Sequence, residues 1–79
     1  MEQIIQKGKA QKLQQGEMSI DFNEPFKHLP IVVISPLWEN QHVGVGYIDT
    51  ITEITLEGFK VSSNNASASF FINWIAVGD

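Results

Sequence analysis

Cysteine and arginine are both absent from this chain of 79 residues. Without cysteine the protein can form neither a disulfide nor a cysteine-ligated metal site, two devices that often stabilise small domains. Only 18% of the residues are charged, and nine acidic side chains against five lysines give a net charge of −4. This acidic balance argues against binding to nucleic acid or to an anionic membrane surface.

Long hydrophobic runs are also missing. No apolar stretch approaches the roughly 18 residues of a membrane span, so membrane insertion is not expected. The opening Met1-Glu2-Gln3 does not begin the basic-then-apolar pattern of a secretory signal. We therefore expect synthesis in the cytosol, with export only by another route such as release of a particle on lysis. The length predicts one domain over residues 1–79 with a modest core, for which oligomerisation is the common stabilising device that remains.

The most informative segment that is present covers residues 70–78. Its sequence FFINWIAVG is nearly apolar throughout, with Asn73 as the main exception. In a strand, the even-numbered residues 70–76 point one way, and the apolar Phe71, Ile75 and Val77 point the other. One face can fill the core of the domain, whereas the other needs a second partner. The run at 31–34 has the same two-faced character.

The rest of the chain predicts strands separated by turns, without a convincing helix. Residues 4–13 form either a first strand or part of a polar arm over 1–13, and residues 18–22 alternate between apolar and polar. Residues 31–34 are a β-branched run closed by Pro36, and residues 43–56 are rich in the valine, isoleucine and threonine that strands prefer. A turn at Glu57-Gly58 leads into residues 59–61. About six short strands with turns every 8–12 residues predict an all-β antiparallel sandwich.

Several motifs occur in the order found in one lectin family. They are Ile20-Asp21-Phe22, Pro25-Phe26, Pro30 followed by Ile31-Val32-Val33-Ile34-Ser35, the corner Ile54-Thr55 with Gly58-Phe59-Lys60, and the closing Ile72-Asn73-Trp74-Ile75-Ala76. Over residues 18–77 the chain resembles the H-type lectin domain of snail agglutinins and of the discoidin C-terminus. The resemblance implies a six-stranded antiparallel β-sandwich that assembles as a homotrimer, sometimes as stacked trimers. It also implies binding of sugars, often N-acetylgalactosamine, near the subunit boundaries; similar domains occur in bacterial proteins and at the ends of phage tail fibres.

The sugar-binding residues of that family are not matched in this chain. The family's acidic N-terminal loop corresponds to Gln14-Gln15-Gly16-Glu17, which has no aspartate pair. The family's arginine at the start of a central strand corresponds to Gly46, and its Trp-His pair corresponds to the 62–67 segment, which contains neither residue. A glycan site in this protein must therefore be built from other residues.

Two segments supply candidate glycan-binding residues. Sugars are held by an aromatic ring against their apolar face and by hydrogen bonds to their hydroxyl groups. The first candidate is the loop Trp38-Glu39-Asn40-Gln41-His42, and the alternative is that Trp38 closes the sandwich edge above an ordinary turn. The second candidate is Asn64 with Asn65, and the alternative there is a plain hairpin turn. Asn65-Ala66-Ser67 also matches a glycosylation sequon, which we expect to be incidental without a signal peptide.

Other chemistry has little support in the sequence. His28 and His42 lie in separate loops without metal-ligand spacing, and the carboxylates of Asp49 and Glu53 are expected to be solvated at the surface. We therefore expect no catalytic residue, no metal and no cofactor. Two functions remain open: a trimeric carbohydrate-binding, lectin-like module for cell adhesion or receptor binding, and a structural trimerisation or attachment module, for instance of a phage tail fibre, without a sugar site.

Overall fold

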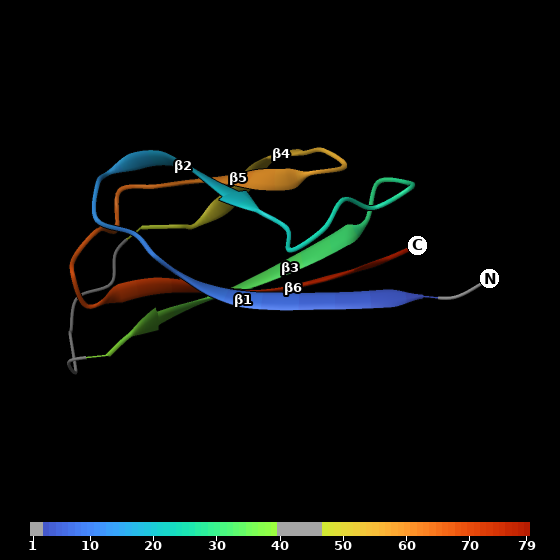
Figure 1. The fold of residues 1–79 in the computed structure, drawn as a ribbon. Coiled ribbons are helices and arrows are strands. Elements are labelled where there is room, and N and C mark those ends of the chain that lie inside the picture. Colours follow the sequence, from blue (N-terminus) through green and yellow to red (C-terminus); the bar gives the residue numbers. More distant parts are fainter. Residues whose placement is uncertain (1–2, 40–46) are drawn as a thin grey trace.

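The computed structural model describes residues 3–39 and 47–79 and shows an all-β protein (Figure 1). The strands are β1 (Ile4–Gln11), β2 (Gly16–Asp21), β3 (Ile31–Trp38), β4 (Thr50–Ile54), β5 (Gly58–Ser63) and β6 (Phe70–Gly78). Within the two described ranges, no helix is long and apolar enough to cross a membrane.

The strands form two three-stranded antiparallel sheets that lie in two layers (Figure 1). Sheet A has the strand order β1-β6-β3, and sheet B has the order β2-β5-β4. The chain changes layer between most successive strands, so each sheet is built from segments far apart in the sequence. This two-layer, sandwich-like arrangement confirms the predicted all-β antiparallel architecture.

Strand β6 lies at the centre of sheet A and has the two apolar faces that the sequence predicts. On its inner face, Phe70, Ile72 and Ala76 are fully buried and Trp74 is 5% exposed. On its outer face, Ile75 is 49% exposed. The inner face therefore forms the core, and the outer face is left at the surface of the single chain.

Aromatic rings from both sheets meet in the core. The ring of Trp74 lies 5.6 Å from that of Phe59 in β5 and 5.7 Å from that of Phe22, which follows β2. Phe26 meets Phe22 edge-on at 5.0 Å. Ring pairs of this kind add about 0.5–1.5 kcal/mol each beyond the burial of their area, so this cluster joins the two layers.

The indole of Trp74 fits only because β1 has a glycine opposite it. Gly8 is the cross-strand partner of Trp74, and a Cβ atom at Gly8 would lie 2.7–2.8 Å from atoms of the indole ring. Such a separation is shorter than van der Waals contact. Gly8 therefore marks a close approach of side chain and backbone, which is a common reason for glycine inside a strand.

Two strand boundaries refine the prediction. The segment at 4–11 is a first strand, β1, rather than a polar arm. Pro36 does not close the third strand, because β3 continues to Trp38. Since β3 pairs with β6 on one side only, it is an edge strand, which is where a sheet tolerates proline.

The predicted strand content of residues 43–56 is found in its second half. Strand β4 begins at Thr50, and residues 43–46 lie outside the described residues. The register between β4 and β5 shifts between Ile51 and Glu53, which leaves Thr52 as the extra residue of a β-bulge.

Candidate functional site

The outer face of sheet A is apolar over one end. Ile5, Val77 and Ile31 form one cross-strand row, and Val33 and Ile75 belong to the next, in which Lys7 of β1 is the third member. We call these five residues the apolar face. Ile31 is 73% exposed, Ile5 68% and Val33 63%. Contiguous exposed apolar patches on soluble proteins commonly mark interaction sites.

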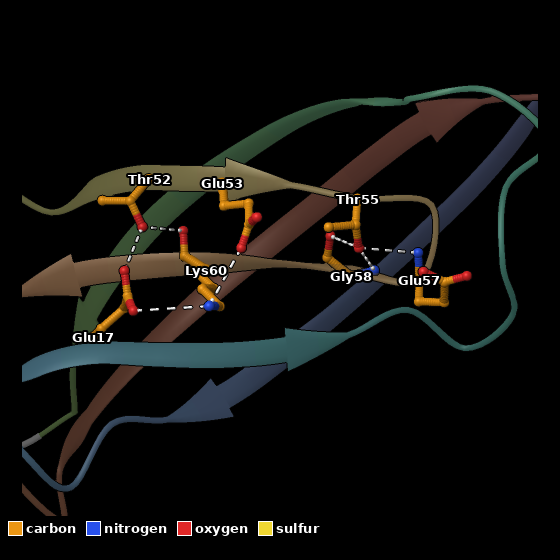
Figure 2. A network of polar contacts seen from close by, with 7 residues as sticks. All are labelled: Glu17, Thr52, Glu53, Thr55, Glu57, Gly58 and Lys60. Carbon is orange, nitrogen blue, oxygen red and sulfur yellow. Dashed lines mark hydrogen bonds and ion pairs between the residues drawn. The ribbon is translucent and has the colours of Figure 1, made fainter.

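The outer face of sheet B has the opposite character (Figure 2). The Lys60 ammonium lies 3.3 Å from the Glu53 carboxylate and 4.0 Å from that of Glu17. The hydroxyl of Thr52, at the bulge, donates a hydrogen bond to Glu17 at 3.0 Å. Exposed ion pairs of this kind contribute only about 0–1 kcal/mol each, so this face is a solvated surface.

The hairpin between β4 and β5 is closed by one threonine (Figure 2). The Thr55 hydroxyl oxygen accepts hydrogen bonds from the backbone N–H groups of Gly58 at 3.1 Å and Glu57 at 3.2 Å. Thr55 is therefore a turn residue.

A hollow of about 350 Å³ lies at the start of β4 and the end of β5. Its lining residues are all uncharged and are Tyr47, Ile48, Thr50, Thr52, Ser62, Ser63 and Asn64. We call it the Tyr47 hollow. Tyr47 is 55% exposed, so its ring is available beside hydroxyl and amide groups. This composition suits a neutral, hydroxyl-rich ligand with one apolar face.

A buried lysine holds the segments around this hollow. The Lys12 ammonium donates hydrogen bonds to the backbone carbonyls of Gln14 at 2.6 Å, Ser63 at 2.8 Å and Asn65 at 3.1 Å. Burial lowers the pKa of Lys12 below its ordinary value, and the nearby Asp49 carboxylate opposes this shift. An ammonium group has three N–H donors, so these three carbonyls match its full hydrogen-bonding capacity.

Asn65 completes this scaffold. Its side chain is buried, and its amide nitrogen lies 3.1 Å from the Tyr47 carbonyl and 3.4 Å from the Asp49 carboxylate, to both of which it donates. These bonds tie residues 47–49 to the end of β5, which places Tyr47 beside Asn64 in the same hollow. Of the predicted glycan-binding pair Asn64 and Asn65, only Asn64 is thus exposed at the hollow. Asn65 is buried, and its hydrogen bonds hold the segments that line the hollow. The burial of Asn65 also leaves the sequon asparagine poorly accessible.

The first predicted loop is described only at its beginning. Trp38 is half-buried, with its ring 4.6 Å from that of Phe70, and the Glu39 carboxylate forms an ion pair with Lys9. Asn40, Gln41 and His42 lie outside the described residues. A ligand site in this loop therefore stays a prediction.

The titratable groups do not assemble a metal site in the described ranges, where no three histidine, aspartate or glutamate side chains gather closely enough. His28 lies 3.2 Å from the Asp79 carboxylate in an exposed pair, and His42 is outside the described residues. Asp49 faces Asn65, whereas Glu53 faces Lys60. These two carboxylates thus contact different partners.

Sequence reasoning did not single out Tyr47 or Lys12. Tyr47 is a lone aromatic residue beside an isoleucine-rich segment, and Lys12 sits in a lysine- and glutamine-rich stretch typical of exposed chain. Comparison with protein-family models, curated proteins and solved structures found no match for the chain. The function is therefore inferred from the two outer faces and the Tyr47 hollow.

Proposed function

We propose that the chain is a homotrimeric, carbohydrate-binding module of the H-type lectin kind, joined through the outer face of sheet A. The observation that carries the sugar assignment is the Tyr47 hollow. It presents an exposed aromatic ring among hydroxyl and amide groups, and no charged residue lines it. A glycan is the ligand class that needs this combination, because sugar rings are neutral, hydroxyl-rich and apolar on one face.

Each hollow is expected to bind weakly by itself. It is open and shallow, and exposed hydrogen bonds to sugar hydroxyls replace bonds to water with little net gain. Three copies that engage one cell surface together gain affinity through effective concentration. Weak single sites and trimeric assembly therefore belong to the same proposal.

The apolar face provides the free energy for assembly. Full burial of a large aliphatic side chain contributes about 1.5–3 kcal/mol. Ile5, Ile31, Val33 and Ile75 are 49–73% exposed, so covering them gives each copy about 4–8 kcal/mol. Association costs about 4–15 kcal/mol in lost freedom, which the faces of several copies together can offset.

The test of the sugar site is Tyr47→Ala. We expect about tenfold weaker binding to responsive members of a broad glycan panel and to bacterial or animal cell surfaces. The reason is that losing an aromatic contact worth about 1–1.5 kcal/mol lowers affinity about tenfold per site. Glycan-array and cell-binding assays at matched protein concentration measure the change.

Two variants serve as controls for Tyr47→Ala. Tyr47→Phe keeps the ring and should retain most of the binding. Leu29→Ala removes a similarly exposed apolar side chain from the β2–β3 connection and should bind as the wild type does. Equal binding by wild type and Tyr47→Ala would rule out this hollow; Trp38→Ala then tests the 38–42 loop, with a check of folding because Trp38 packs on Phe70.

The structural attachment module is the second candidate. Its support is that the lectin family's arginine and Trp-His pair correspond in sequence to Gly46 and residues 62–67, which lack those side chains, while the apolar face needs no ligand to function. A stable trimer that binds no member of the glycan panel and no cell surface would favour this candidate over the lectin.

Assembly is tested separately with Val33→Asp. A carboxylate within the apolar face should convert the trimer to a monomer at micromolar concentration, because burying an unpaired charge costs several kcal/mol. Light scattering after size exclusion measures the mass. Ile48→Asp places the same charge on an 85%-exposed side chain at the Tyr47 hollow and should leave the trimer intact. A monomeric wild type would contradict the proposed assembly.

A further inference from the structure

A polar row crosses the outer face of sheet A between apolar neighbours. Asn73 in the central strand pairs in register with Lys9 of β1 on one side and with Ser35 of β3 on the other. Ile75 and Val33 of the apolar face lie in the adjacent row on one side, and Phe71 and Leu37 lie in the row on the other side. Over β6 and β3, neutral polar groups are thus placed between apolar rows, whereas β1 contributes Lys7, Lys9 and Gln11 to the same rows.

The two neutral members of this row have hydrogen-bonding capacity to spare. Lys9 is engaged, since it pairs with Glu39 and lies over the Phe71 ring at 4.4 Å from its centroid. Within residues 3–39 and 47–79, neither the side-chain amide of Asn73 nor the side-chain hydroxyl of Ser35 forms a hydrogen bond. Both residues line a hollow of about 500 Å³ together with Val33 and Ile75.

The charge distribution favours a second copy of the same face as the group that covers this surface. Strands β3 and β6 contain no charged residue, and the cations Lys7 and Lys9 lie on the edge strand β1. Two or three copies can therefore approach over β6 and β3 with little repulsion. The outer face of sheet B, with Glu17 and Glu53, is poorly suited to cover isoleucine and valine side chains.

We infer that Asn73, together with Ser35, forms the polar contact between copies that fixes their register and number. An amide both donates and accepts hydrogen bonds, so Asn73 is complementary to the same residue and to Ser35 in another copy. An arrangement that buries either group without a partner is disfavoured. A single buried asparagine in an apolar interface can specify oligomeric state in this way at some cost in stability. The inference rests on the proposed trimer and adds the residues that select it.

The test is Asn73→Leu, measured by native mass spectrometry and thermal unfolding. The isosteric apolar side chain should raise the melting temperature but yield more than one oligomeric mass, since apolar contacts alone tolerate several alignments. Asn73→Ser keeps a polar group and should remain a single species. Asn73→Asp should weaken association at least tenfold at neutral pH because like charges then meet. Ser19→Leu adds an apolar side chain to the outer face of sheet B and should change neither the masses nor their distribution.

The outcomes separate this inference from the proposed assembly. A wild type that stays monomeric at micromolar concentration overturns both. A trimeric wild type together with an Asn73→Leu variant that is folded and equally uniform in mass overturns the role of Asn73 alone. Circular dichroism confirms that each variant keeps its strand content before its mass is interpreted.

Discussion

Replacing Trp74 with alanine is expected to leave the chain largely unfolded at room temperature. The indole is 5% exposed and contacts the rings of Phe22 and Phe59, which belong to the opposite side of the core. Removing a buried tryptophan costs about 3–5 kcal/mol. Whole domains are stable by only about 5–15 kcal/mol, and a chain of this size lies toward the lower end. Urea unfolding followed by circular dichroism measures the loss.

The neighbouring residue provides the control for this variant. Ile75→Ala alters the adjacent position of β6 but removes a side chain that points to the outer face and is 49% exposed. We expect Ile75→Ala to fold with native strand content and to weaken self-association. A folded Trp74→Ala with a near-unchanged melting temperature would show that the core does not depend on this ring.

Lys12→Met is expected to destabilise the fold by about 2–4 kcal/mol, because it leaves three backbone carbonyls without their donor. Those carbonyls belong to Gln14 in the β1–β2 connection, to Ser63 at the end of β5 and to Asn65 in the β5–β6 connection. Methionine keeps most of the volume, so the loss reports mainly on hydrogen bonding. Urea unfolding gives the change in the free energy of unfolding, and glycan binding should fall as well because the same bonds position Asn64.

Lys27→Met is the matched control for Lys12→Met. It makes the same chemical change at an exposed residue of the β2–β3 connection and should alter stability by less than about 0.5 kcal/mol. Equal stability of the two variants would contradict the structural role of the buried ammonium.

The strands were largely predictable because their signals are local. The two faces of β6 follow from the order of apolar residues at 70–77, and the turn at Glu57-Gly58 follows from turn chemistry. The extent of β3 was not predictable in the same way. A proline normally ends a strand, and only the edge position of β3, which is a property of the whole sheet, makes Pro36 acceptable.

The candidate site was less predictable, since it is assembled from distant segments. Asn64 was identified by its residue type, but Tyr47, whose ring lines the same hollow, lies on another connection. Its position beside Asn64 depends on the hydrogen bond from the Asn65 side chain to the Tyr47 carbonyl. The burial of Lys12 depends on carbonyls 51 and 53 residues further along the chain. A lysine in a polar stretch carries no local sign of such partners.

The central place of β6 also bears on how the chain is made. β6 comes last of the six strands, yet both other strands of sheet A pair only with it, and its register joins Ile4 to Gly78. During synthesis, β1 and β3 therefore remain unpaired until β6 leaves the ribosome. Contacts of such long sequence separation make folding slow. The β-branched run in β3 is exposed in the meantime, so we expect chaperone capture, or aggregation when expression is fast, to be the main hazard in its biogenesis.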